Sequence, residues 1–82
     1  MPMSTVKFKT FDVRPLLSQG VEPFPEIRRR VDALTPGNGV AVVAPFLPAP
    51  LIEMLKSEGF GSRVERRADG AWAAFFWRDN PA

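Results

Sequence analysis

The chain has 82 residues, enough for one small domain, and its hydrophobic content of 45% and charged content of 24% are ordinary for a globular protein. It contains no Cys, His or Tyr, which excludes thiol nucleophiles, disulfides and the commonest zinc ligands. The net charge is only +2, so the pI of 9.7 reflects missing side chains that titrate near neutrality rather than a strong positive field.

These absences predict that packing, with or without self-association, stabilises the fold, and that no metal or other cofactor is bound. The first residues lack the apolar core of a signal peptide, and no apolar run approaches the ~20 residues of a membrane span. We therefore expect a cytoplasmic protein that makes no membrane contact.

The first predicted element is a strand over residues 5–11, where apolar and polar residues alternate. Its alternation places Lys7 and Lys9 on one side and a buried face on the other. Lysines on a terminal strand are typical of a sheet edge. Residues 16–23, rich in Ser, Gln, Gly and Pro, are expected to form a loop.

A first helix is expected from about Phe24, since Pro25 suits a first turn. One apolar stripe recurs at helical spacing and consists of Phe24, Ile27, Val31 and Leu34. Residues 35–39, Thr-Pro-Gly-Asn-Gly, predict a stop and a turn.

The next segment, 40–44, is apolar throughout, as in an interior strand. A second helix follows from about Pro48 to Glu58. Gly59 fits the left-handed position after the helix, with Phe60 packing back on Leu55.

Two strands close the chain, at residues 62–67 and 71–78, and Asp69-Gly70 between them is a strong hairpin signal. The order strand, helix, strand, helix, strand, strand predicts a two-layer α/β (α+β) sandwich. Its four-stranded mixed sheet would carry both helices on one face. We expect a single domain over residues 1–82 with an ordered core of about 5–78.

Four local signatures resemble the TusA/SirA-like family of small sulfur carriers. They are a strand ending Asp-x-Arg (Asp12 and Arg14), a loop before the first helix, the turn Pro36-Gly37 and the pair Gly59-Phe60. The resemblance implies the same fold. At the position of the family's sulfur-carrying cysteine, counted back from the Pro-Gly turn, this chain has Gly20. The closest likeness is to an uncharacterised cysteine-free branch, and it implies that no sulfur is carried.

The first candidate site is the loop that enters the first helix, with Asp12, Arg14, Gly20 and Glu22. Free N–H groups at a helix start favour anions, and Arg14 suits a carboxylate or phosphate. The alternative is that Asp12 and Arg14 pair locally, Gly20 only makes a turn, and Glu22 already occupies the helix start.

The second candidate is the open sheet face. With a two-residue turn at Asp69-Gly70, Arg67 lies opposite Trp72 and Arg63 opposite Phe76, and these four residues share that face. A three-residue turn with a bulge would exchange the two faces. Arginines beside aromatic rings suit a protein contact, often self-association, or base stacking, or pair within the chain. We favour the protein contact.

Two further segments have simpler interpretations. Arg28, Arg29 and Arg30 point about 100° apart around a helix and predict a solvated surface rather than a phosphate site. Residues 45–50, Pro-Phe-Leu-Pro-Ala-Pro, form an apolar loop that either closes over the core or serves as a contact ridge.

The sequence therefore predicts a small non-enzymatic binding or accessory module whose partner is either another protein or a second copy in a homodimer. The alternative is an RNA- or single-strand-binding domain that uses the open sheet face. A sulfur-transfer or other enzyme is the least favoured interpretation.

Overall fold

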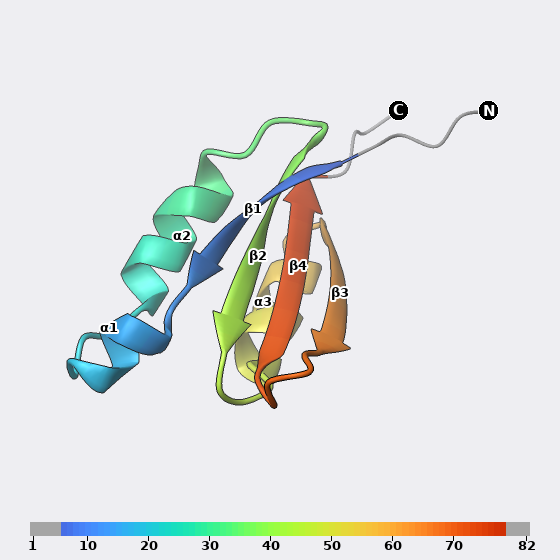
Figure 1. Ribbon diagram of the computed structural model, residues 1–82. Helices are drawn as coiled ribbons and strands as arrows, with labels where there is room; N and C mark the ends of the chain where they lie inside the picture. Colours follow the sequence, from blue (N-terminus) through green and yellow to red (C-terminus); the bar gives the residue numbers. More distant parts are fainter. Residues whose placement is uncertain (1–5, 79–82) are drawn as a thin grey trace.

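The computed structural model describes residues 6–78 as strands and helices in the order shown in Figure 1. The elements are β1 (Lys7–Asp12), α1 (Arg14–Ser18), α2 (Phe24–Asp32), β2 (Asn38–Ala44), α3 (Ala49–Ser57), β3 (Phe60–Arg66) and β4 (Trp72–Arg78). The predicted core boundary at residue 5 lies outside the described residues.

The strands form one mixed sheet in the order β1-β2-β4-β3. β1 runs parallel to β2, whereas β4 runs antiparallel to both β2 and β3. β2 and β3 therefore point the same way with β4 between them, and the connection through α3 crosses the sheet. The predicted α+β class and four-stranded mixed sheet are confirmed.

Both longer helices cover the same face of the sheet. One cluster of buried side chains joins Ile27 and Val31 of α2 and Leu55 of α3 to Val42 of β2 and Phe76 of β4. Figure 1 looks onto the opposite face, with α3 visible behind the sheet. This two-layer arrangement is the predicted one.

β2 lies between β1 and β4, and its residues 39–44 are all buried. The prediction of an interior strand is confirmed. The predicted end of α3 is also confirmed: Gly59 has φ +94 and Phe60 packs in the same cluster as Leu55. The N–H of Gly59 donates to Lys56 O, as expected of a left-handed helix ending.

The predicted loop over residues 16–23 is wrong in its first part, because α1 occupies Arg14–Ser18. Pro15 lies in the first turn of this helix, where its fixed φ favours helix. Leu17 packs against the core, which supplies the burial that so short a helix needs. The element order therefore gains one helix after β1.

The hairpin between β3 and β4 has a longer turn than its Asp-Gly sequence predicts. The N–H of Arg67 donates to Ala71 O at 2.8 Å, and Gly70 has φ +87. Three residues therefore form the turn, with the glycine in the left-handed region. Arg66, not Arg67, lies opposite Trp72.

This change of one residue exchanges the two faces of β4. Arg63 pairs with Phe75, not with Phe76. Phe76 is 0% exposed in the core beneath the helices, and Trp72 shares its face by alternation. The predicted interaction face of Arg63, Arg67, Trp72 and Phe76 is therefore wrong, because Trp72 and Phe76 lie on the helix-covered face. The alternative with a three-residue turn is the observed one.

The faces of β1 are likewise the reverse of the prediction. The Phe8 ring lies on the open side of the sheet, with its centroid 5.1 Å from that of Phe75 and 6.1 Å from that of Trp77. Lys7 and Lys9 point to the helix-covered side, where they border a hollow next to α2. Because α2 leaves this edge of the sheet uncovered, the lysines stay solvated there.

The strand register predicts that two adjacent phenylalanines of β4 contribute unequally to stability. We expect Phe76→Ala to lower the free energy of unfolding by about 3–5 kcal/mol, since it removes a fully buried ring and leaves a cavity. Phe75→Ala, on the half-buried open face, should cost clearly less. Denaturant unfolding measures both, and a larger loss for Phe75→Ala would contradict the observed register.

Candidate functional site

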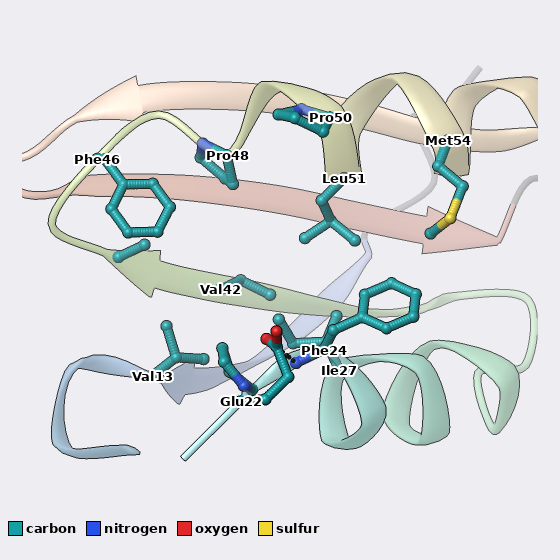
Figure 2. A pocket seen from close by; sticks show the side chains of 12 residues that line it. Val13, Glu22, Phe24, Ile27, Val42, Phe46, Pro48, Pro50, Leu51 and Met54 are labelled. Carbon is teal, nitrogen blue, oxygen red and sulfur yellow. Dashed lines mark hydrogen bonds between the residues drawn. The ribbon is translucent and has the colours of Figure 1, made fainter. Parts of the chain in front are cut away.

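An apolar groove of about 310 Å³ opens between the first turns of α2 and α3 (Figure 2). In Figure 2, α3 and its preceding loop form one wall, α2 forms the other, and β2 forms the floor. The lining side chains are Val13, Glu22, Pro23, Phe24, Ile27, Val42, Ala44, Phe46, Pro48, Pro50, Leu51 and Met54.

Prolines fix both helix starts that border the groove. Pro23 precedes α2 and Pro25 lies in its first turn, while Pro48 precedes α3 and Pro50 lies in its first turn. A proline ring holds φ near −65°, so these segments lose little conformational freedom on binding. The groove is therefore preorganised by the local sequence.

Apolar side chains also surround the groove on the outside. Five large hydrophobic residues are markedly exposed in the described chain, and four of them are Val21, Phe24, Phe46 and Leu47. Val21 lies just before α2 and Phe24 at its start, Phe46 and Leu47 lie in the loop before α3, and Phe46 is 53% exposed. A gathering of exposed apolar side chains around a hollow is typical of an interaction site. The apolar loop 45–50 is thus a ridge beside this groove.

Glu22 is the only charged residue, among those described, that lines the groove. Its Oε1 atom accepts a hydrogen bond from the N–H of Phe24 at 3.2 Å, which satisfies one free donor at the start of α2. The remaining carboxylate oxygen can accept from a donor in the groove. The site therefore offers an apolar surface with one negative charge at its edge.

The other residues of the predicted anion loop lie apart from this groove. Arg14 donates from Nη2 to Asp12 Oδ2 at 2.7 Å and from Nη1 to Asp69 Oδ2 at 3.1 Å. Its guanidinium thus joins the end of β1 to the β3–β4 turn. Two carboxylates already surround it, which leaves little positive charge for an incoming anion.

These contacts shift the pKa values of the carboxyls. Hydrogen bonds from the Arg14 side chain lower the pKa of Asp12 below its ordinary value. The pKa of Asp69 falls to about 2, first because its carboxylate accepts the N–H of Ala71 and then because of Arg67 and Arg14. Both carboxylates stay ionised at neutral pH and act as structural acceptors.

Gly20 ends α1 rather than forming part of a site. Its φ is +76, a conformation that L side chains rarely adopt, and its N–H donates to Leu17 O at 3.0 Å. This is the turn-forming role that the sequence left as the alternative. A cysteine here would be strained, although space around the position is open.

The four residues of the predicted interaction face are not brought together. The Arg63 guanidinium lies 4.6 Å from the Phe75 ring centroid, and Arg66 lies 5.1 Å from that of Trp72. Arg67 donates instead to Asp69 in the turn. The aromatic residues on the open face are Phe8, Phe75 and Trp77.

The sequence predicted a contact ridge over residues 45–50 as one of two alternatives and Glu22 as a candidate site residue, but not the groove that they share. The signal that could have found it is the pair of proline-flanked helix starts carrying Phe24 and Phe46. Within residues 6–78, no set of acidic or other metal-ligating side chains is arranged to hold a metal ion. None of the helices described is long and apolar enough to cross a membrane.

Comparison with known proteins gives one family. The model of a family described as "Uncharacterized conserved protein (DUF2249)" matches residues 10–78. No curated protein and no solved structure was found to match the chain.

The shifted pKa of Asp69 predicts an acid effect on stability. Folding lowers this pKa from 3.8 to about 2, so the native state binds the proton less readily than the unfolded chain. The stability from ionised Asp69 is therefore present above pH 3.8 and is lost as the pH falls through about 2. We expect the unfolding midpoint of Asp69→Asn to fall less than that of the original chain across this range.

Glu53→Gln is the matched control for this acid titration, because Glu53 is an exposed carboxylate with no ion pair among residues 6–78. Its melting curves should follow those of the original chain at every pH. Identical acid profiles for Asp69→Asn and the original chain would contradict the assigned hydrogen bonds.

Proposed function

The chain belongs to the DUF2249 family of uncharacterized conserved proteins, and we propose that it is a non-enzymatic binding module that takes an apolar side chain of a partner protein into the groove between α2 and α3. The observation that carries this proposal is the groove itself, preorganised by prolines and surrounded by exposed Phe24, Phe46 and Leu47. Aromatic residues and Met, both present in its lining, are enriched in protein interfaces.

The extent of the apolar surface favours a protein segment over a small molecule. A ligand that only filled the groove would leave Val21 and Leu47 in water, because neither residue lines it. A segment anchored by one side chain would cover them as well. Burying apolar area stabilises a complex by about 25 cal/mol per Å². A protein segment that also covers Val21 and Leu47 would therefore bind more strongly than a ligand that only fills the groove.

The charge of the groove favours a different protein over a second copy. A symmetric dimer formed through this surface would bring the two Glu22 carboxylates toward each other in an apolar contact. A partner with Lys or Arg next to its apolar anchor would instead pair with that carboxylate. We therefore infer an anchor such as Phe or Leu with a basic neighbour.

The RNA-binding alternative depends on arginines and aromatic rings that are free together on the open face. Arg63 instead pairs with Glu65 at 3.2 Å and stacks on Phe75, while Arg67 contacts Asp69. The open face is thus occupied largely by contacts within the chain, which favours the groove as the binding surface.

We also propose a distant relation to the TusA/SirA-like carriers. The mixed four-stranded sheet, the Asp12–Arg14 pair and the left-handed Gly37 and Gly59 support it. Gly20 at the carrier position has no thiol, so the relation would be one of fold and not of sulfur transfer.

The groove can be tested with capped dipeptides by NMR. We expect N-acetyl-phenylalanyl-lysinamide to shift the methyl signals of Ile27, Leu51 and Met54 with a dissociation constant of about 1 mM, near −4 kcal/mol. N-acetyl-glycyl-lysinamide lacks the anchor and should bind more weakly. N-acetyl-phenylalanyl-glutamate amide lacks the cation and should also bind more weakly.

Two surface variants separate the groove from general apolar exposure. Phe46→Ser removes an exposed rim residue and should weaken the phenylalanyl-lysinamide complex severalfold without unfolding the chain. Val64→Ser is the matched control, because Val64 is 39% exposed on β3 and does not line the groove. Equal weakening by both variants, or no preference for the apolar anchor, would reject the proposal. Sedimentation of the free chain would reveal a dimer if the occupant were a second copy.

A further inference from the structure

A second hollow, of about 440 Å³, lies on the other side of α2, between the last turns of that helix and the exposed edge of β1. Four cationic side chains line it: Lys7 and Lys9 from β1, and Arg29 and Arg30 from α2. No acidic residue of the described chain is part of this lining. Its charge is thus opposite to that of the apolar groove.

The two lysines carry charge that the described residues leave uncompensated. Lys7 and Lys9 are exposed, lie two residues apart on one side of β1, and form no ion pair within residues 6–78. Alternate residues of a strand lie about 6.6 Å apart, so two ammonium groups can contact neighbouring phosphates of one ligand.

The two arginines share a single carboxylate. Glu26 accepts from Arg30 Nε at 2.9 Å and from Arg29 Nε at 3.1 Å, with a further contact to Arg29 Nη2. One negative charge faces two positive charges, and the Arg29 side chain is 70% exposed. The hollow therefore keeps a net positive charge even with this pairing.

The carbonyl end of a helix normally repels anions, but here it is partly neutralised. The Arg78 guanidinium donates from Nε to Leu34 O at 2.8 Å, just beyond the end of α2. The half-buried Leu34 side chain adds apolar surface inside the hollow. The site therefore combines cations at its rim with an apolar patch that suits a planar or aliphatic group.

We propose that this hollow binds a small organic anion that carries two or more linked phosphates, with the nucleoside triphosphates as the fitting chemical class. The spaced lysines contact the phosphates, and the half-buried side chain of Leu34 contacts the apolar part of the ligand. The proposal is independent of the protein-binding groove, because the two hollows share no residue.

A long nucleic acid is disfavoured because the positive surface does not continue. Beyond the hollow, Arg28 is enclosed by Asp32 at 2.7 Å and Glu58 at 2.7 Å. The whole chain carries a net charge of only +2. A continuous backbone track needs cations spaced along many phosphates, and a compact cluster fits a short polyphosphate instead.

NMR titration of the full chain with orthophosphate, pyrophosphate, tripolyphosphate and ATP tests the site. We expect affinity to rise with the number of phosphates, to fall with added salt, and to be highest for ATP. Amide signals of residues 7–9, 29–35 and 38–40 should shift, while those of the apolar groove stay in place. Absence of shifts with tripolyphosphate and ATP at millimolar concentration would overturn the proposal.

Three charge variants with opposite expectations make the test specific. Lys7→Gln with Lys9→Gln should weaken ATP binding about tenfold, since it removes two exposed ion pairs to the phosphates. Glu26→Gln should strengthen it about threefold by releasing Arg29 and Arg30 from their shared carboxylate.

Lys56→Gln removes the same single charge as Lys7→Gln or Lys9→Gln alone, but from α3, outside the hollow, and should leave ATP affinity unchanged beyond the small effect of net charge. Equal losses from Lys56→Gln and from either lysine of β1 would show general charge attraction and reject the site. A single strand of about twelve nucleotides that binds far more tightly than ATP would assign the surface to nucleic acid instead. Denaturant unfolding of each variant confirms that the fold is kept.

Discussion

The central strand β2 is the constraint on which the rest of this structure depends. Residues 39–44 are buried on both faces, so a chain without disulfides has to cover this strand from two sides. The helices cover one side, and the rings of Phe8, Phe75 and Trp77 cover the other from neighbouring strands. Glycines make this second cover possible: a Cβ at Gly39 would lie 2.5 Å from the Phe8 ring, and one at Gly61 would lie 2.1 Å from the Trp77 ring. The aromatic residues of the open face therefore lie against the sheet and act as its own cover.

The same constraint explains why the hollows lie beside α2. α2 packs mainly on β2 and α3 mainly on β3, so the two helices separate across the width of the sheet. The space between their first turns is the apolar groove, and the loops that lead into them supply its rim. On its other side α2 does not reach the edge of β1, and the basic hollow occupies that gap. Both hollows thus result from covering four strands with two nine-residue helices.

The sequence predicted those features that depend on local patterns. Helical spacing located α2 and α3, the apolar run 40–44 located β2, and Gly59 located the end of α3, because each signal lies within one element. The hairpin register could not be predicted, since Asp69-Gly70 fits both a two-residue and a three-residue turn and a slip of one residue reverses every side chain of β4. The groove could not be predicted either. It depends on the distance between segments 21–24 and 46–54, which no local pattern sets.

The placement of charge along α2 gives the two hollows opposite chemistry at a short distance. Nine helical residues span about 13 Å, more than the Debye length of about 8 Å at physiological ionic strength. Glu22 lies just before α2, whereas Lys7 and Lys9 lie near its end. Salt therefore screens these opposite charges from each other, and each can act on a separate ligand. Along α2 itself, Arg28 pairs with Asp32 and Glu58. Glu26 pairs with Arg29 and Arg30. Under our two proposals, a ligand with an apolar anchor and a cation binds at one end of α2 and a polyanion binds at the other, so occupancy of one site would not by itself prevent occupancy of the other.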